Sequence, residues 1–403
     1  MSLAKALDGV GTGALTEESL SRRVYPLFSK SLGISGIYLA NHSLGRPLDQ
    51  TEEDLCEGFR LWQSKLGDAW EWWLEEQEAH RSRLARLIGA PRSDCIVPKA
   101  SAGQGLRTIL NSLPGVPRVV SSTGEFDSID VILKQYAALG RITLHQAPCE
   151  SADGGLDLTL LIERIRRGAD LVILSQVMFM TGRIVPELDR LAELCHEFGA
   201  RLAVDAYHSA GVFPIDVSAM KADFLIGGSY KYLRGGPGAA FLYISPDAVA
   251  GLRPFDIGWF AKEDPFRYTR EERPRLAAGG NAFLESTPPV LTYYQARAGQ
   301  QLALGLGIDR IRAYSLDLLG RLKSYLEQAE VPAKGADNDH GAFLTVEDAQ
   351  ASLLVTALER VRVTTDSRGR WLRMSPDYLT RDEDLRAAAS LLGAIWRDRR
   401  REQ

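Results

Sequence analysis

Apolar residues gather in short continuous runs through the middle of the chain, and between the runs they recur every three or four positions. The continuous runs predict strands at 118–122, 141–146, 171–177, 201–208, 223–228 and 239–244. The periodic stretches predict amphipathic helices with the sequences SIDVILKQYAALG, LTLLIERIRRGA and ELDRLAELCHEFG. Strands rich in Val, Ile and Leu that alternate with such helices predict a mostly parallel sheet covered on both faces.

The pattern differs on either side of this segment. Ahead of it, a single long helix dense in charge and tryptophan is predicted from Thr51 to Gly89. After it, residues 258–276 are charged and punctuated by proline, without periodicity, and predict a loop. The tail then combines helices with two predicted strands, at 342–347 and 370–376.

These changes of pattern predict an α/β protein with a large domain and a smaller α+β domain. We expect an N-terminal arm at 1–50 that docks on the small domain. The large domain is expected at 51–257, and an interface loop with the small C-terminal domain at 258–403. A chain of 403 residues is long enough for two such cores.

Composition narrows the function classes. The 48 basic and 52 acidic residues give a formal charge of −4, so no basic surface for nucleic acid is predicted. The four cysteines are far apart and form no CxxC pair, which argues against a zinc site and a disulfide-rich secreted fold. No stretch approaches the roughly 20 apolar residues of a membrane span, and a cytoplasmic location without membrane association is expected.

The strongest chemical signal lies between residues 201 and 244. One apolar strand ends in Asp205, with His208 three residues later, and a second ends at Tyr230-Lys231, followed by a loop rich in glycine. Ligands of open α/β sheets bind beyond the carboxyl ends of the strands. A lysine packed there between Tyr230 and Tyr232 is desolvated, which favours the neutral amine that forms a Schiff base. Asp205 would stabilise a protonated pyridine nitrogen of pyridoxal phosphate (PLP).

Other sites are weaker. Asp205 and His208 could ligate a metal, but the six histidines are scattered and no second pair accompanies them, so no metal is expected. No GxSxG elbow supports a serine hydrolase. The tryptophans near the start of the large domain favour core or dimer packing over a substrate site.

The stretch DAYHSAG…DFLIGGSYKYLRGGPG resembles the cofactor-binding core of class V, fold type I, PLP-dependent enzymes, and among them most resembles kynureninase. IYLANHSLGRP at 37–47 resembles the family's Asn-Ser-Leu-Gly segment, with His42 inserted between Asn41 and Ser43. GWF, STPP and WLRMSP follow in family order. The resemblance implies a PLP cofactor and the fold type I architecture.

Carried over residue by residue, the resemblance implies that Lys231 forms the Schiff base with PLP. The same comparison implies that the remaining cofactor-binding residues are Ser101, Ala102, Phe126, Asp205, His208 and Tyr230, with the phosphate at the loop of residues 99–103. A phosphate suits that place because free N–H groups and the positive end of a helix dipole meet there.

Three further cofactor residues, Trp259, Ser286 and Thr287, match a segment that crosses from the partner subunit in the family. This implies a homodimer with shared active sites. Arg373 is the candidate for the substrate carboxylate, because a guanidinium binds a carboxylate through two parallel hydrogen bonds. Asn41 and Ser43 are the other implied substrate residues. The nearby Arg362, Arg368 and Arg370 are expected to be surface charges.

The resemblance implies an enzyme that acts on a small-molecule substrate, an L-amino acid, through an external aldimine and a quinonoid. It implies cleavage at the β-carbon by a kynureninase-like hydrolase or lyase. Two positions tied to kynurenine recognition differ, since Thr287 replaces an Asn and Leu66-Gly67-Asp68 stands where a Gly-His segment is usual. A class V aminotransferase is the alternative, and a PLP-binding protein without turnover is a second one. A cysteine desulfurase is disfavoured because no cysteine follows Cys195.

Overall fold

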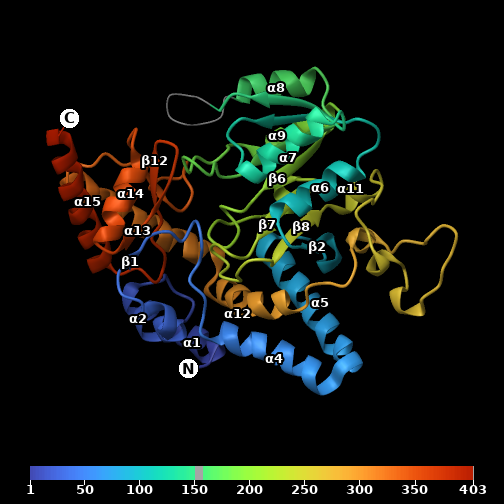
Figure 1. The fold of residues 1–403 in the computed structure, drawn as a ribbon, viewed down its shortest axis with the longest axis horizontal. Helices are drawn as coiled ribbons and strands as arrows, with labels where there is room; N and C mark the ends of the chain where they lie inside the picture. The colour runs from blue at the N-terminus through green and yellow to red at the C-terminus, as the bar shows by residue number, and fades with distance from the viewer. Residues whose placement is uncertain (150–157, 403) are drawn as a thin grey trace.

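The computed structural model describes residues 1–149 and 158–402, and a seven-stranded sheet forms its centre (Figure 1). The strands, in spatial order, are β2 (Ile96–Lys99), β8 (Ala240–Ile244), β7 (Phe224–Gly228), β6 (Arg201–Asp205), β5 (Leu171–Ser175), β3 (Arg118–Ser122) and β4 (Thr143–Ala147). Neighbours from β7 to β4 are parallel, whereas β8 is antiparallel to both β7 and β2. The predicted fold class, a mostly parallel mixed sheet covered by helices, is confirmed.

Successive residues of the central strands bury their side chains on opposite faces of this sheet. On one face, Ile173 of β5 and Ile226 of β7 pack with helices α6 and α7. On the other, Val172 and Leu174 pack with α8 and α9. Both faces are therefore apolar, which is why these strands show continuous runs of Val, Ile and Leu in the sequence.

The helices surround this sheet and build most of the remaining structure. They are α1 (Leu3–Val10), α2 (Glu17–Arg23), α3 (Ser29–Leu32), α4 (Gln50–Lys65), α5 (Trp70–Ile88), α6 (Ala102–Ser112), α7 (Asp127–Ala138), α8 (Leu158–Arg166), α9 (Leu188–Glu197), α10 (Val217–Met220), α11 (Pro246–Val249), α12 (Leu291–Leu306), α13 (Ile308–Gln328), α14 (Ala351–Arg360) and α15 (Asp382–Glu402). Short 3-10 helices lie at η1 (Tyr25–Phe28), η2 (Leu66–Ala69), η3 (Ser93–Cys95), η4 (Trp259–Ala261), η5 (Pro265–Arg267) and η6 (Gly279–Phe283).

The prediction of one helix from Thr51 to Gly89 is wrong. The chain turns at Leu66, whose φ is +49°, and α4 and α5 form the two arms of a V (Figure 1). Each arm has its own partner: α4 packs along α12 through Gly58, while α5 buries Leu84 in the core beside the sheet. A straight helix of that length could not serve both surfaces.

The tryptophans of the two arms have different environments. Trp73 is buried beside Tyr294 and donates from Nε1 to the carbonyl of Gly58, 3.1 Å away. Trp62, on the outer side of α4, is 54% exposed, and its neighbours Phe59 and Leu66 are 44% and 69% exposed. The outer side of α4 therefore carries an exposed apolar surface.

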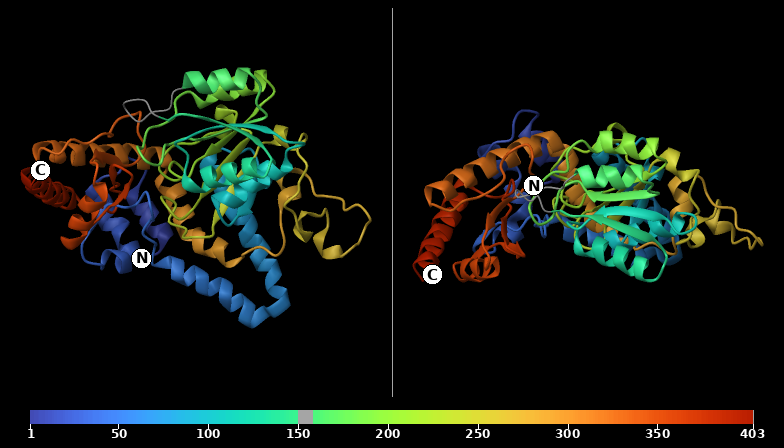
Figure 2. Two further views of the ribbon diagram at one scale, coloured as in Figure 1. Left: turned by 45° about the horizontal axis from the view of Figure 1, so that its top comes forward. Right: turned by 90° about the horizontal axis from the view of Figure 1, so that it is seen from above.

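The C-terminal part of the chain contributes a three-stranded antiparallel sheet in the order β11 (Asp366–Arg368), β12 (Trp371–Met374) and β9 (Leu344–Glu347). The N-terminal segment joins it, because β1 (Ile37–Tyr38) pairs in parallel with β10 (Val363–Thr364). Figure 2 shows the blue N-terminal helices beside the red C-terminal ones, away from the large sheet. Chain segments from both ends therefore meet next to the carboxyl ends of the large sheet's strands.

Within the described residues, no helix combines the length and the apolar character that crossing a membrane requires.

Candidate active site

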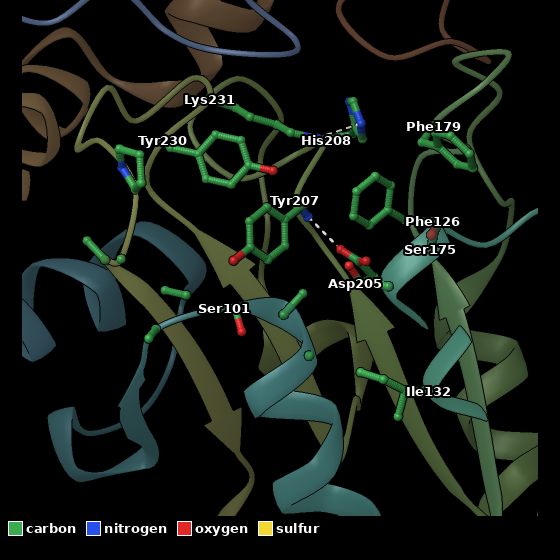
Figure 3. Close-up of a pocket in the computed structure, with 18 of the residues that line it drawn as sticks. Ser101, Phe126, Ile132, Ser175, Phe179, Asp205, Tyr207, His208, Tyr230 and Lys231 are labelled. Carbon is green, nitrogen blue, oxygen red and sulfur yellow. Dashed lines mark hydrogen bonds between the residues drawn. The ribbon is translucent and has the colours of Figure 1, made fainter. Parts of the chain in front are cut away.

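A cavity of about 420 Å³ opens at the carboxyl ends of β5, β6 and β7 (Figure 3). Its wall brings together most of the residues that the sequence predicted to bind a cofactor: Ser101, Ala102, Phe126, Asp205, His208, Tyr230 and Lys231. These residues come from four different segments of the chain. The order of the parallel strands collects them at one edge of the sheet, as is usual for ligand sites in this architecture.

Lys231 occupies a buried place at the centre of this group. Its Nζ atom lies 2.7 Å from Nε2 of His208, and the aromatic rings of Phe126, Tyr207 and Tyr230 are 5.7–5.8 Å from the same atom. Burial lowers the pKa of Lys231 well below its ordinary value, although the carboxylate of Asp205 opposes the shift. The surroundings therefore favour a neutral, nucleophilic amine at neutral pH.

The partner of Lys231, His208, is neutral as well. Burial lowers the pKa of His208 far below its ordinary value, and the nearby Lys231 adds to the effect. Nδ1 of His208 is buried and has no hydrogen-bond partner among the described residues. An orphaned ring nitrogen at this depth is what a bound ligand with a complementary group would satisfy.

Asp205 lies at the floor of the cavity, at the last position of β6. Its Oδ1 accepts a hydrogen bond from the backbone N–H of Tyr207 at 2.9 Å (Figure 3). Burial raises the pKa of Asp205, while this hydrogen bond and the charge of Lys231 lower it. A buried carboxylate at this position is suited to accept a hydrogen bond from a protonated ring nitrogen.

The opposite end of the cavity is formed by the start of α6. Ser101 caps this helix, because its hydroxyl accepts from the N–H of Gln104 at 3.2 Å. The first-turn amides of Ala102 and Gly103 lie in the cavity wall at the positive end of the helix dipole, where an anion is stabilised. Lys99 points elsewhere: its Nζ is 2.7 Å from Oε1 of Glu285, in a neighbouring cavity.

One detail of the predicted lysine environment is wrong. Tyr232 does not flank Lys231; its ring is buried on the other side, beside Tyr314. In the glycine loop, only Pro237 and Gly238 line the cavity. Gly235 approaches α12 instead, where a Cβ atom would lie 2.8 Å from that of Ala296, so the glycine serves helix packing rather than ligand approach.

Comparison with known proteins identifies the family of this chain. The family model described as Aminotransferase class-V matches residues 61–370, which span the large sheet and the whole cavity. The chain belongs to the class V aminotransferase family. The predicted resemblance is thereby confirmed, and membership of this family implies pyridoxal phosphate as the cofactor.

Relatives of this class V enzyme carry two kinds of name. An uncharacterised aminotransferase of Bacillus subtilis, YcbU, is 28% identical over 358 residues, 87% of this chain and 91% of the relative. The kynureninase of Deinococcus radiodurans is 29% identical over 295 residues, 70% of this chain and 69% of that protein. The chain is thus similar to members with different reactions.

Solved structures share the fold at lower identity. A cysteine desulfurase from Thermococcus onnurineus superimposes with a TM-score of 0.79 at 21% identity, covering 89% of this chain and 94% of that one. The cystine C-S lyase C-DES, solved with its product cysteine persulfide, has a TM-score of 0.81 at 20% identity, covering 89% and 97%. These likenesses establish fold type I for the class V chain.

The residues present fit PLP. The cavity offers a partner for each polar group of PLP. The buried Lys231 suits the aldehyde, Asp205 suits the ring nitrogen, and the helix N-terminus at Ser101 suits the phosphate. The orphaned ring nitrogen of His208 is left for a further polar group. Phe126 lies next to Asp205 in the cavity (Figure 3), and its ring stands at 87° to the ring of Phe179.

Three predicted cofactor residues lie outside this cavity within one chain. Ser286 and Thr287 line a neighbouring cavity of about 270 Å³ together with Lys99. Trp259 belongs to an aromatic cluster in the 258–276 loop, where its ring centroid is 4.3 Å from that of Phe260. Within a single chain, these three residues therefore lie apart from Lys231.

The predicted substrate residues lie on the small-domain side. Asn41 is buried and donates from Nδ2 to the carbonyl of Ser375 at 2.8 Å. Ser43 is half-buried in the turn that follows. Arg373 is 2% exposed, and its guanidinium donates to the carboxylate of Asp366. Among the described residues that line the Lys231 cavity, Arg373 is absent.

The predicted segment around Asn41 and Ser43 reaches Lys231 from above. The N–H of Gly45 donates to the carbonyl of Tyr230 at 2.8 Å, and a Cβ atom on Gly45 would lie 1.9 Å from the carbonyl oxygen of Lys231. Only glycine permits this approach. The glycine that ends the predicted Asn-Ser-Leu-Gly segment is therefore required by contact with the lysine strand.

Sequence reasoning missed several side chains of the site: Ser175, Phe179 and Tyr207 line the cavity, and Glu125 lies buried behind it. Glu125 accepts hydrogen bonds from the N–H and the hydroxyl of Ser175, at 2.7 and 2.6 Å. Burial raises the pKa of Glu125 to about 7, against the hydrogen bonds from Ser122 and Ser175. Ser175 ends the strand next to that of Asp205, a signal in the sequence that could have identified it.

In the part of the chain that the structure describes, no group of three or more His, Cys, Asp and Glu side chains is arranged to hold a metal ion.

Proposed function

We propose that this class V enzyme cleaves an L-amino acid at its β-carbon, as a kynureninase-like hydrolase or lyase. One observation carries the proposal: Lys231 Nζ lies buried 2.7 Å from a neutral His208, beside Asp205. This arrangement offers an amine that can take a proton and, next to it, a second group that can move one. Cleavage at the β-carbon requires proton transfer at two carbons, so two such groups are needed.

Each residue has a separate part in this scheme. PLP, when bound, supplies an aldehyde that condenses with amines and a ring that withdraws electrons from the bonds of the α-carbon. Lys231 would hold the cofactor at rest and accept the α-proton once released. Asp205 would keep the ring nitrogen protonated, and the first turn of α6 would hold the phosphate. Nδ1 of His208 would be available to the cofactor or to the substrate side chain.

Similarity supports the substrate class. Kynureninases at 25–29% identity cover up to 91% of this chain. The proposed substrate is an L-amino acid with a carbonyl or a leaving group on its β-carbon, and its α-carboxylate would be bound by Arg373. Thr287 and the Leu66-Gly67-Asp68 turn differ from the kynureninase pattern, which favours a substrate other than kynurenine.

An aminotransferase reaction is the second candidate, favoured by the 28% identity with YcbU over 91% of that relative. It would use the same Lys231 and Asp205, with Lys231 moving the proton of the α-carbon while the bond between the α- and β-carbons stays intact.

The protein is also proposed to act as a homodimer. Ser286 and Thr287 lie apart from Lys231 within one chain, and large apolar side chains are exposed nearby on α4 and on the 258–276 loop, including Trp62 at 54% and Tyr268 at 69%. A second copy could cover this surface and bring Ser286 and Thr287 to the cofactor. Sedimentation equilibrium at twice 44.4 kDa is the expected result; a monomer at micromolar concentration would contradict it.

The chemistry can be tested in two steps. Borohydride reduction of the purified protein should leave a pyridoxyl group on Lys231, found by peptide mass mapping, and Lys231→Ala should lose it while the exposed control Lys134→Ala keeps it. A panel of L-amino acids then separates the reactions. Hydrolysis of a β-carbonyl substrate releases alanine together with the side-chain acid, and loss of a β leaving group releases ammonia with a keto acid; both leave the cofactor as PLP. Formation of a keto acid together with pyridoxamine phosphate would instead favour the aminotransferase. An unmodified Lys231 would overturn both.

A further inference from the structure

All three nitrogens of the Arg373 guanidinium donate hydrogen bonds within the protein. Nε donates to Oδ1 of Asp366 at 2.8 Å and Nη2 donates to Oδ2 at 2.6 Å, which is the geometry by which an arginine binds a free carboxylate. Nη1 donates to the carbonyl of Phe179, a residue of the Lys231 cavity wall. Asp366 therefore occupies the place that a substrate carboxylate would take on Arg373.

Asp366 has a second buried partner. Its Oδ1 lies 2.7 Å from Nε2 of His42, a side chain that is 0% exposed. Burial raises the pKa of Asp366, but His42 and Arg373 outweigh it and hold that pKa well below its ordinary range. The carboxylate is thus ionised and can only accept, so Nε2 of His42 carries the proton of this hydrogen bond.

The other ring nitrogen of His42 is then an unprotonated acceptor. Burial lowers the pKa of His42 to about 4, with Arg373 adding to the effect and Asp366 opposing it, so the ring is neutral at pH 7. Nδ1 is buried and has no hydrogen-bond partner within residues 1–149 and 158–402. A neutral histidine with an orphaned basic nitrogen therefore sits on the carboxylate that holds Arg373.

This cluster of Arg373, Asp366 and His42, which we call the Arg373 cluster, is next to the Lys231 cavity. The rings of His42 and His208 are stacked with centroids 6.4 Å apart, and Phe343 contacts both at 5.0 and 5.6 Å. The cations that face His42 are Arg373 from β12 and Lys231 from the loop after β7, and its one anionic neighbour in the described chain is Asp366 from β11. His208 is its uncharged titratable neighbour.

We propose that Asp366 is an internal stand-in for the substrate carboxylate, and that His42 takes up a proton when the substrate displaces Asp366 from Arg373. The inference rests on the proposed role of Arg373 and adds two positioning residues to it. Binding brings in one negative charge and releases Asp366 from Arg373, which leaves it with the more exposed Arg368, whose Nη2 lies 3.6 Å from Oδ2. A proton from solvent on Nδ1 of His42 then places a buried cation beside Asp366 in exchange for the buried guanidinium that it has lost.

The exchange has two measurable consequences. A carboxylate must compete with Asp366, so the substrate-free protein binds it more weakly than an open arginine would. Binding must also take up a proton, so it strengthens as the pH falls toward the range in which His42 titrates. Neither consequence is expected if Asp366 and His42 only brace the fold around a permanently occupied Arg373.

Propionate, which has a carboxylate but no amine, is a suitable probe for the PLP-loaded protein. Calorimetric titration at pH 6 in two buffers of different ionisation enthalpy gives both the Kd and the number of protons taken up. Asp366→Asn should tighten the Kd about tenfold or more and abolish proton uptake. His42→Asn, which keeps a donor to Asp366, should weaken the Kd and also abolish uptake.

The controls separate this inference from the role of Arg373 itself. Arg373→Lys should weaken propionate binding strongly; if it does not, the carboxylate binds elsewhere and the proposed anchor is wrong. If Arg373→Lys weakens binding while Asp366→Asn leaves the Kd and proton uptake as in the parent protein, the anchor stands and the stand-in is overturned. The visible absorbance of the Lys231-linked cofactor reports whether each variant folds. If Asp366→Asn does not fold, His42→Asn decides: loss of proton uptake supports the stand-in, and unchanged uptake overturns it.

Discussion

The Lys231 site and the Arg373 cluster are neighbouring groups of polar side chains that differ in whether their hydrogen-bonding atoms have partners within the protein. At the Lys231 site, burial lowers the pKa of both Lys231 and His208, and Nδ1 of His208 lacks a partner in the described protein. In the Arg373 cluster, each of the three guanidinium nitrogens donates a hydrogen bond, either to Asp366 or to the carbonyl of Phe179. The difference indicates that the first site is arranged for an occupant, whereas the second must release an internal one before it can bind.

Removal of Asp366 tests the second half of this comparison and has the largest expected effect. Asp366→Ala leaves a buried guanidinium without its counter-ion, which should lower the free energy of unfolding by about 3–5 kcal/mol. Urea denaturation of the PLP-loaded protein measures it. The matched control Glu193→Ala breaks the exposed pair with Lys221 and should cost less than about 1 kcal/mol. Equal losses in the two variants would mean that the Arg373 cluster is not a tightly satisfied group.

Asp205→Asn tests the first half. The amide can still accept from the N–H of Tyr207, so the fold should persist, but the charge that balances a protonated ring nitrogen is lost. We expect kcat to fall about 10²–10³-fold with little change in the melting temperature, measured on the substrate that the amino-acid panel identifies. Asp247→Asn, on exposed α11, is the control. A kcat within threefold of the parent would remove Asp205 from the chemistry.

The pH dependence of cofactor loading is a second test of the Lys231 site, with a smaller expected effect. The pKa of Lys231 is lowered to about 7, chiefly by burial, and only the neutral amine condenses with PLP. Loading should therefore quicken as the pH rises through 7 and level off above 8. The neutral fraction grows about tenfold between pH 6 and 8, against about a hundredfold for an ordinary lysine.

Stopped-flow mixing of the apoprotein with PLP, followed by visible absorbance, measures this dependence. A rate that keeps rising beyond pH 9 would indicate a lysine of ordinary pKa and would contradict the desolvated environment.

Much of the large sheet could be predicted, because each central strand is apolar on both faces. The predicted strand at 118–122 agrees with β3, and the other predicted strands contain the observed ones or overlap them. The break between α4 and α5 could not be predicted, since it depends on α12, more than 200 residues away, which α4 packs against. The short pair of β1 and β10 is likewise set by contact between distant segments.

The site shows the same division. Asp205, His208 and Lys231 could be found because the ends of adjacent parallel strands must converge, and the structure brings them to one cavity. The state of Arg373 could not be found, because nothing in its local sequence reveals that Asp366 and His42 fold onto it from two other segments. Which residues bear a charge is visible in a sequence; which charges are already neutralised depends on tertiary contacts.

The position of Gly45 against Lys231 has a consequence for how the molecule is made. The segment that carries Gly45 is anchored by β10 and by a bridge from Ala40 to Ser375, near the far end of the chain. At a synthesis rate of about 5–20 residues per second, residue 363 follows residue 37 by roughly 20–70 s. Throughout that interval the nascent large domain would carry an open lysine, and the active site would be closed over only when the last strands emerge.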